Sequence, residues 1–362
     1  MKAFQTLFAQ LQCSKKKSSS PEPLAKQLKI QTSVQQDVQE FNNLLMNYID
    51  DIFKNHESKL PRAVIEEYGG ISSYQTRCQE CKNISCSDAS FIEIELSILG
   101  KKDLHSCLKS FVQSETLEGA NQYRCDNCEK LVDAKRRRLF RSLPPVLNFQ
   151  LLRFIYDPET FTKKKYMESF SFPRKLTGMK QYCIKDDMET EGTFEYDLSA
   201  VLLHIGDSAT HGHYIAHIRD EETGKWWQFD DTEVREIEAH QVGDLDEATK
   251  SLWNGTSLRR SANSLKAKVK PNSDLSSKNA YMLVYTRSGR ETKEPYPPPL
   301  PLEAVEHSNE KLQMIVNKWH DEHDHEQAIR AQHRELYEEF MRLAPISKNQ
   351  TFYWISVHWL ST

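Results

Sequence analysis

Residues 202–234 read LLHIGDSATHGHYIAHIRDEETGKWWQFDDTEV, and this stretch decides the fold. Two runs rich in β-forming residues flank a short polar turn that contains a glycine, which predicts a hairpin with its turn at residues 220–225. Folding the hairpin back brings Asp230 or Asp231 beside His213. A carboxylate that holds one ring N–H of an imidazole leaves the other nitrogen to act as a base. The stretch therefore predicts half of a catalytic site.

The alternative is an ordinary structural pair, because most neighbouring histidines and aspartates in proteins have no catalytic role. The sequence around the pair favours the catalytic interpretation. It runs, in order, through His204-x-Gly206, Gly212-His213-Tyr214 and Trp226-x-x-Phe229-Asp230-Asp231. This order resembles the histidine box of the ubiquitin-specific proteases, which are papain-like cysteine peptidases that remove ubiquitin from proteins.

The resemblance implies a role for each polar residue of the stretch. His213 is expected to be the general base, and Asp230 the carboxylate that orients it. Asp231 is the neighbour that can share or take over the role of Asp230. His204 and Tyr214 are expected to contact ubiquitin.

Composition excludes several other classes of function. The chain has 362 residues, 38% of them hydrophobic, and a formal net charge of -4, so it gives no overall electrostatic case for binding nucleic acid or a membrane. No apolar run approaches transmembrane length, and the start of the chain is not a convincing secretory signal. We expect a globular protein of the cytoplasm, the nucleus or both.

Cysteine spacing predicts a metal site. Two of the eight cysteines form Cys78-x-x-Cys81 and two form Cys125-x-x-Cys128, a pattern typical of a four-thiolate zinc site. The two pairs lie farther apart than in a compact zinc ribbon, so the helix-like segment 102–113 must be an insertion between them. The resembled family carries such pairs in its fingers subdomain. The cysteines without a comparable partner are interpreted as small apolar or surface residues: Cys86, Cys107 and Cys183.

A second box lies near the start of the chain. Ser33-x-x-Gln36 has the form of a capping box and predicts a helix that begins near Val34, with Asp37 in its first turn. On pattern alone, Asp37 would only complement the helix dipole. Residues 35–41, however, resemble the glutamine-aspartate box of the same family. That resemblance implies that Asp37 and Glu40 contact the basic C-terminal arm of ubiquitin, a task suited to carboxylates.

The resemblance runs from about residue 34 to residue 287 and implies an α+β, papain-like fold with thumb, palm and zinc-bearing fingers. The strands expected within it cover residues 71–76, 90–98, 142–156, 194–205 and 279–287. The expected domains are the catalytic domain over 1–289, with a mobile insertion at 242–277, a Pro-rich spacer and long helix over 290–345, and the start of a DUSP-like module over 346–362.

Each of two further motifs can be interpreted either as a functional signal or as an ordinary solvent-exposed surface. The run AKRRR at residues 134–138 could be a nuclear address, but a solvated strand face is preferred. His320, His323 and His325 could bind metal, but a solvated helix face is preferred because no second cluster completes a site.

The nucleophile of the family has no recognisable counterpart in this sequence. In the family it sits in a Gly-Asn-Thr-Cys box, and no such box occurs among the 362 residues. Cys13 lies in a loop-like Leu-Gln-Cys-Ser context without the surroundings that activate a thiol. The segment 3–11 resembles the tail of a helix and residues 351–360 a module cut short, so truncation is favoured over true loss of the box.

We therefore expect a thiol-dependent deubiquitinase that hydrolyses isopeptide bonds after the C-terminal glycine of ubiquitin, with this chain inactive by itself. The expected partners are ubiquitin and ubiquitinated proteins, and the expected cofactor is a structural Zn²⁺. The alternative is a non-catalytic, ubiquitin-binding pseudoenzyme. A zinc-ribbon protein that binds nucleic acid is disfavoured by the acidic balance.

Overall fold

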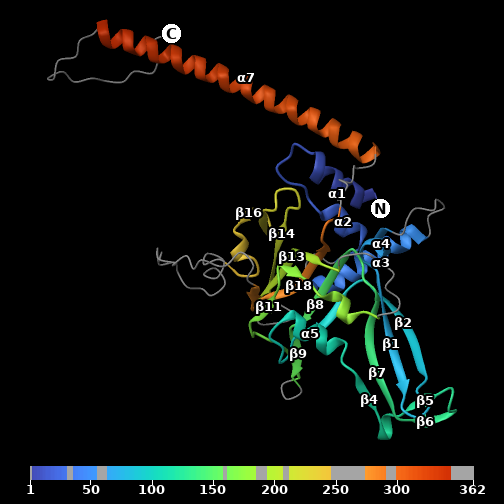
Figure 1. The fold of residues 1–362 in the computed structure, drawn as a ribbon. Coiled ribbons are helices and arrows are strands. Elements are labelled where there is room, and N and C mark those ends of the chain that lie inside the picture. Colours follow the sequence, from blue (N-terminus) through green and yellow to red (C-terminus); the bar gives the residue numbers. More distant parts are fainter. Residues whose placement is uncertain are drawn as a thin grey trace. The chain divides into compact units, whose positions relative to one another are not determined.

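Two sheets organise the described part of residues 33–292, and Figure 1 shows β1, β2 and β7 of one sheet reaching away from the other. The computed structural model describes residues 2–30, 36–54, 63–157, 161–184, 194–206, 212–245, 274–290 and 299–343. It divides into two compact units, Ser33–Thr292 and the pair of segments Met1–Thr32 and Lys293–Thr362. The sequence predicts one domain over 1–289, whereas the structure groups the first 32 residues with the C-terminal helix.

The larger of the two sheets, here called the palm sheet, has the order β16-β15-β14-β13-β18-β8-β3, with β12 paired to β13, in the described part of the chain. Its pairs are antiparallel except β3 with β8. Its strands are β3 (Ile94–Ser97), β8 (Val146–Leu152), β12 (Lys175–Leu176), β13 (Tyr196–Ile205), β14 (His213–Arg219), β15 (Trp226–Asp230), β16 (Glu233–Ile237) and β18 (Ala280–Arg287).

The two faces of the palm sheet are covered by different helices. Phe149 of β8 faces the main hydrophobic core, which also contains Leu104 and Leu108 of α5 (Leu104–Phe111). The next residue of β8, Gln150, points to the opposite face, because side chains alternate along a strand. Its register partner Glu95 accepts a hydrogen bond from Gln39 of α3 (Val38–Lys54). Helices α5 and α3 therefore lie on opposite faces of the palm sheet.

The second sheet, here called the fingers sheet, has the order β2-β1-β7-β4 and extends away from the palm sheet in Figure 1. Its strands are β1 (Gly70–Cys78), β2 (Ile84–Phe91), β4 (Glu115–Leu117) and β7 (Ala134–Ser142), and the ribbon β5 (Tyr123–Cys125) with β6 (Lys130–Val132) lies near its tip. The strand predicted over 90–98 is wrong as one element. The chain leaves the fingers sheet at Phe91 and enters the palm sheet at Ile94, so its two halves pair with different neighbours.

The strand predicted over 142–156 is also divided, and Arg153 marks the division between β8 and β9 (Phe154–Asp157). The Arg153 side chain is 0% exposed. Its guanidinium donates to the carbonyl oxygens of Tyr166, Glu168, Ser277 and Ala280. Burial lowers the pKa of Arg153 to about 10. The strand is interrupted at the residue whose buried guanidinium donates these four hydrogen bonds.

The segment 242–277 does not behave as one insertion. Val242 and Leu245 are buried, and β17 (Leu275–Ser277) pairs with β11 (Phe170–Phe172). Both ends of the segment therefore belong to the folded unit, because their apolar side chains join its core. Residues 246–273, like the DUSP-like module predicted from 346 onward, lie outside the described residues.

The smaller unit contains α1 (Lys2–Cys13), α2 (Glu22–Gln27) and α7 (Pro299–Leu343). Ala9 and Val305 are its buried apolar residues in the described part. The spacer predicted over the proline-rich residues ends earlier than expected, because Pro299 and Pro301 lie in the first turn of α7, where proline costs no hydrogen bond. None of the described helices is long and apolar enough to cross a membrane.

The remaining elements of the larger unit are short. They are α4 (Ala63–Tyr68), β10 (Thr162–Lys165), η1 (Gly119–Asn121), η2 (Met179–Tyr182) and η3 (Ala239–Gln241). Of these, β10 pairs with β9 in a two-stranded ribbon that brings Lys165 opposite Phe154.

Replacing Arg153 tests whether this cation holds the unit together. Arg153→Met should lower the free energy of unfolding by about 3–5 kcal/mol, because four carbonyl oxygens lose their donor in a buried site. Urea unfolding followed by tryptophan fluorescence measures the change. Arg77→Met, at an exposed position of β1, is the matched control and should change stability by less than about 0.5 kcal/mol. A similar, small change in both variants would contradict the assignment.

Candidate active site

The predicted hairpin is present as β14 and β15, with Ala216 opposite Phe229. Asp220 organises the turn, because its carboxylate accepts hydrogen bonds from the backbone N–H groups of Glu222 and Thr223. Gly224 supplies the left-handed backbone that this turn needs, with φ +70°. Continuing this register puts the last residue of β15 diagonal to the first residue of β14, on the same face of the hairpin.

These two residues are His213 and Asp230, and their side chains are in contact. The distance from His213 Nε2 to Asp230 Oδ1 is 2.6 Å, a charge-assisted hydrogen bond in length. With the proton of the neutral ring held on Nε2, the basic lone pair lies on Nδ1. The pair is therefore oriented as a base and its positioning carboxylate would be.

Asp231 lies near the pair but in a different conformation. Its φ of +49° is in the left-handed region, so it departs from the strand that ends at Asp230. Ligand atoms of His213, Asp230 and Asp231 lie within 4.8 Å of one another, which would also suit a cation. Asp230 reaches hydrogen-bond distance of the imidazole. This contact favours Asp230 over Asp231 as the candidate orienting residue.

His204 occupies a different environment from the one that the sequence predicts. The residue is 0% exposed and is surrounded by the rings of Phe154, Tyr214 and Tyr281 at centroid distances of 5.2, 4.9 and 6.1 Å. Neither ring nitrogen hydrogen-bonds to any residue that the structure describes. Burial, followed by the nearby Lys165 ammonium, lowers the pKa of His204 to about 4. The expected contact of this side chain with ubiquitin is therefore corrected, because a buried neutral ring offers a partner no surface.

Gly212 is required by the packing of His204. A Cβ atom at position 212 would overlap the His204 ring and the carbonyl oxygen of Ile205. The space that a side chain at position 212 would need is already filled by His204 and the end of β13. The residue before the base can therefore only be glycine without a shift of the neighbouring strand end.

Asp37 lies at the N-cap of α3, one residue before the helix. Its Oδ1 accepts hydrogen bonds from the backbone N–H groups of Gln39 and Glu40 at 2.7 and 3.4 Å. The helix therefore begins at Val38, and the predicted start near Val34 is wrong, because Asp37 is a strong capping residue that precedes the first helical turn. Residues 31–35 lie outside the described part of the chain.

The second oxygen of Asp37 joins the helix to the palm sheet. Asp37 Oδ2 accepts a hydrogen bond of 2.8 Å from the hydroxyl of Tyr281 on β18. The Tyr214 hydroxyl accepts from the backbone N–H of Val38, while burial and the Asp37 carboxylate raise the pKa of Tyr214 to about 12. Asp37 and Tyr214 thus lie together, half-buried, on the same face as α3, while Glu40 is exposed.

Lys165 is a site residue that sequence reasoning missed. It is buried, and its ammonium donates to the carbonyl oxygens of His204 and Gly206 and to the Asn279 side chain. These contacts fix the end of β13, from which the chain continues toward His213. The sequence gives little signal for this role, because Lys165 closes the basic run 163–165, which is typical of an exposed turn.

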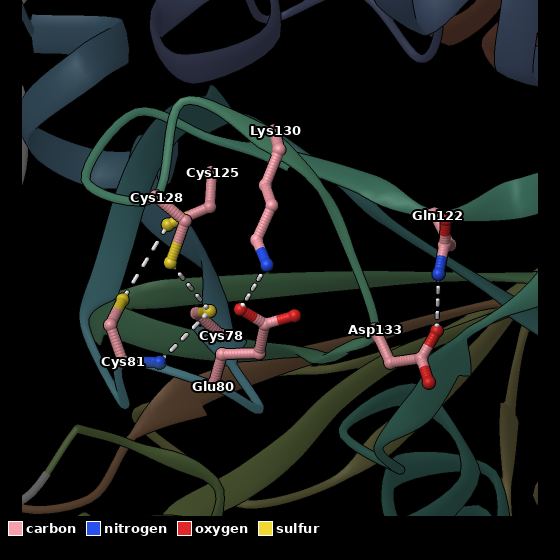
Figure 2. A network of polar contacts seen from close by, with 8 residues as sticks. All are labelled: Cys78, Glu80, Cys81, Gln122, Cys125, Cys128, Lys130 and Asp133. Carbon is pink, nitrogen blue, oxygen red and sulfur yellow. Dashed lines mark hydrogen bonds and ion pairs between the residues drawn. The ribbon is translucent and has the colours of Figure 1, made fainter.

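The four paired cysteines converge at the tip of the fingers sheet, as Figure 2 shows. The sulfur of Cys78 lies 3.9 Å from that of Cys128, and the sulfur of Cys81 lies 3.6 Å from that of Cys125. All four sulfurs lie within 4.8 Å of one another, close to the edges of a tetrahedron with bonds of about 2.3 Å to a central zinc. Between the two pairs lies α5, as the predicted insertion requires.

The two cysteine pairs share a local geometry that suits metal binding. The residue after each pair, Lys82 or Glu129, has a left-handed backbone with φ of +63° or +56°. Hydrogen bonds from the Asn83 backbone and the Asn127 side chain lower the pKa of Cys81 to about 6, while the hydrogen bond with Cys81 raises the pKa of Cys128 to about 12. The thiolate form that a metal needs is therefore favoured at Cys81.

Acid should weaken the fold through His204. The pKa of this histidine in the fold, about 4, is below its ordinary value of 6.5, so the neutral form is the one that the fold stabilises. Its contribution is complete above pH 6.5 and is lost as the pH falls toward 4, because only the unfolded chain takes up the proton in that window. The loss should reach about 2–3 kcal/mol.

Urea unfolding at several pH values measures this dependence. His204→Gln, which cannot take up a proton, should be less stable than the natural chain at neutral pH but should have a shallower slope below pH 6.5. Equal slopes in the two proteins would contradict a buried neutral imidazole.

Comparison with known proteins gives a consistent result. The model of the ubiquitin carboxyl-terminal hydrolase family matches residues 1–285. Ubiquitin carboxyl-terminal hydrolase 48 of Danio rerio is 35% identical over 374 residues, which cover 98% of this chain and 33% of that protein. Ubiquitin carboxyl-terminal hydrolase 26 of Oryza sativa subsp. japonica is 31% identical over 380 residues, which cover 98% of this chain and 35% of that protein. The chain thus spans about a third of the length of these curated relatives.

A solved structure is similar over most of the chain. It is the SAGA Ubp8/Sgf11/Sus1/Sgf73 DUB module bound to ubiquitin aldehyde, of which one chain is 25% identical with a TM-score of 0.53. The match covers 73% of this chain and 52% of that one. The predicted α+β fold of the ubiquitin-specific protease type is confirmed, and the chain belongs to the ubiquitin carboxyl-terminal hydrolase family.

Proposed function

We propose that this chain forms the base-bearing part of a thiol-dependent deubiquitinase that hydrolyses isopeptide bonds after the C-terminal glycine of ubiquitin. The observation that carries the proposal is the contact of 2.6 Å between His213 Nε2 and Asp230 Oδ1. Family membership supports the reaction class, and the relatives' name states hydrolysis at the carboxyl terminus of ubiquitin.

The geometry supports the following role for the pair. His213 takes the proton of a cysteine thiol through Nδ1, and the thiolate attacks the carbonyl carbon of the isopeptide bond. The same proton then goes to the leaving lysine amine, and water hydrolyses the thioester that remains. Asp230 holds Nε2 throughout and stabilises the imidazolium that forms between the two transfers.

We infer that the nucleophile is not among the eight cysteines of this chain. Four converge at the tip of the fingers sheet. Burial raises the pKa of Cys107 and of Cys183 to about 12, which is the opposite of activation. Cys86 lies on β2 in the fingers sheet, and Cys13 closes α1 in the smaller unit, where its carbonyl oxygen accepts a hydrogen bond from Asn309.

Recognition of ubiquitin is proposed to involve Asp37, Glu40 and Tyr214. The similar solved structure is described as bound to ubiquitin aldehyde, which supports ubiquitin as the partner. Asp37 is held by α3 and Tyr281, so its carboxylate would meet a basic peptide in a fixed orientation. His204, which is buried, would act by supporting the ring of Tyr214.

A zinc ion is proposed to be held by Cys78, Cys81, Cys125 and Cys128. Such an ion would supply a structural crosslink between β1 and the β5–β6 ribbon, because all four ligands would be protein thiolates. Around the cluster, Lys130 pairs with Glu80 at 2.8 Å, and Gln122 donates to Asp133 at 2.8 Å (Figure 2). The Lys130–Glu80 pair joins the same two segments that the metal would join, and the Gln122–Asp133 contact links the two ends of the ribbon.

Loss of one ligand tests the metal. Cys78→Ser should reduce zinc from one ion per chain to a small fraction, measured by elemental analysis, and should lower Tm by about 5–15 °C, as a loss of a few kcal/mol would in a unit of this size. Cys86→Ser, on an exposed strand position, is the matched control and should retain both zinc and Tm. Zinc retained after Cys78→Ser would contradict the proposed ligand set.

The proposed function is tested with ubiquitin in two formats. Calorimetry should show binding of ubiquitin that weakens by about tenfold in Asp37→Asn, because one charge-assisted contact loses its charge while the cap is kept. Glu222→Gln, in the hairpin turn, is the control and should bind as the natural chain does. Unchanged affinity in Asp37→Asn would return Asp37 to a purely capping role.

The second format is ubiquitin with a thiol-trapping group at its C-terminus, followed by mass spectrometry. This chain should form no adduct. The same chain with a family nucleophile box joined ahead of residue 1 should form one, and His213→Ala should then prevent it. No adduct in the extended chain would favour the non-catalytic alternative, and an adduct at Cys13 would show that our assignment of the nucleophile is wrong.

A further inference from the structure

The basic run at residues 134–138 lines a hollow that the proposed function does not use. The hollow, here called the arginine hollow, has a volume of about 280 Å³ and lies between β7, β4 and the end of α5. Its main lining residues are Tyr74, Phe111, Glu115, Arg136, Arg137 and Arg138. The expectation of a merely solvated strand face is therefore incomplete, because alternate arginines of the run line a concave surface.

Side chains alternate between the two faces of the sheet along β7, so the basic residues of the run do not all lie on one face. Arg138 is the register partner of Tyr74, and Arg136 that of Thr76, so these two arginines share one face of the fingers sheet. The guanidinium carbon of Arg136 lies 4.5 Å from the centre of the Tyr74 ring, and that of Arg138 lies 5.2 Å from it. Two cations are thus placed on one aromatic ring.

Further contacts fix the Arg138 guanidinium in place. It lies 4.5 Å from the centre of the Phe111 ring, and its Nε and Nη2 donate to the Ser72 hydroxyl at 3.2 and 3.1 Å. Arg137 is likewise held, by two hydrogen bonds to the Gln75 side chain. Guanidinium groups held in this way lose little further freedom when they bind an anion.

The charge of the hollow is not balanced by its own residues. Glu115 is its one lining carboxylate, and it lies 3.9 Å from Arg136, at the limit of an ion pair between exposed side chains. The hollow is therefore lined by more cations than carboxylates. A bound anion would relieve the repulsion between the cations and would be attracted to the hollow.

We propose that the arginine hollow binds a phosphate monoester carried on a peptide, such as a phosphoserine side chain of a substrate or partner protein. The planar forks of arginine match the oxygens of phosphate, and arginine clusters are a recurring means of reading phosphorylated peptides. The volume is at the low end for small-molecule sites, which suits a single oxyanion. Nucleic acid is disfavoured, because the guanidinium groups already occupy the Tyr74 ring on which a base would stack.

The hollow is separate from the proposed active site and does not depend on it. Phe111 ends α5, which covers the Phe149 face of the palm sheet. Asp37 and α3 lie on the Gln150 face, where the ubiquitin tail is proposed to bind. A phosphorylated peptide in the hollow and ubiquitin at Asp37 would therefore occupy opposite faces, so both could be bound at once.

The test uses the full chain and a short glycine-serine peptide that carries one phosphoserine. Calorimetry should show saturable binding that weakens at high salt, with no binding of the unphosphorylated peptide. Arg136→Gln combined with Arg138→Gln should weaken binding by about tenfold or more. The matched control is Arg77→Gln with Lys135→Gln, which removes two charges from partners on the other face of the same strands and should change affinity by less than about twofold.

A variant that binds more tightly provides a test that misfolding cannot explain. Glu115→Gln removes the competing carboxylate and should tighten binding of the phosphopeptide by about two- to fivefold. The proposal is overturned by any of three results: no saturable binding by the natural chain, equal affinity for a peptide with glutamate in place of phosphoserine, or equal losses in the double variant and its control. Tighter binding of a short single-stranded RNA than of the phosphopeptide would overturn it as well.

Discussion

The buried guanidinium of Arg153 is the interaction on which the geometry of the larger unit depends. It joins four carbonyl oxygens from segments that lie far apart in sequence, at Tyr166, Glu168, Ser277 and Ala280. A buried charge is tolerated only where polar partners surround it, and here those partners are backbone dipoles and not a carboxylate. The start of β18 and the end of β17 are therefore fixed against the end of β8, in the centre of the palm sheet.

A second buried cation, Lys165, links the Arg153 contacts to the segment that leads to the candidate base. Lys165 directly precedes Tyr166, one of the acceptors of Arg153, and binds the carbonyl oxygens of His204 and Gly206. The His204 ring in turn packs against Gly212, the residue before His213. His213 is thus held from two sides, by this chain of contacts and by Asp230 across the hairpin. A base held in this way loses little entropy when it meets a nucleophile, which is what positioning contributes to catalysis.

The features that the sequence predicts well are those set by local pattern. The hairpin follows from its turn residues, and the cysteine cluster follows from two short spacings. The features that it misses depend on contacts between distant segments. A single apolar run such as 142–156 does not show that Arg153 will interrupt it, because the acceptors of Arg153 lie up to 127 residues away. The burial of His204 and of Lys165 cannot be predicted from the sequence either, because both are polar residues that are buried only by contacts with distant segments.

The fingers sheet connects two polar sites through the register of its strands. Strands β1 and β7 pair from Cys78 opposite Ala134 at the tip to Ile71 opposite Ser142 at the root, with one irregularity next to Ile71. Because side chains alternate, a slip of one residue at the tip would turn Arg136 and Arg138 to the other face of the sheet. Cys78 is fixed by the cysteine cluster, and its position sets the register of β1 against β7. The cluster at the tip therefore also favours the register in which Arg136 and Arg138 line the hollow, although the two sites share no residue.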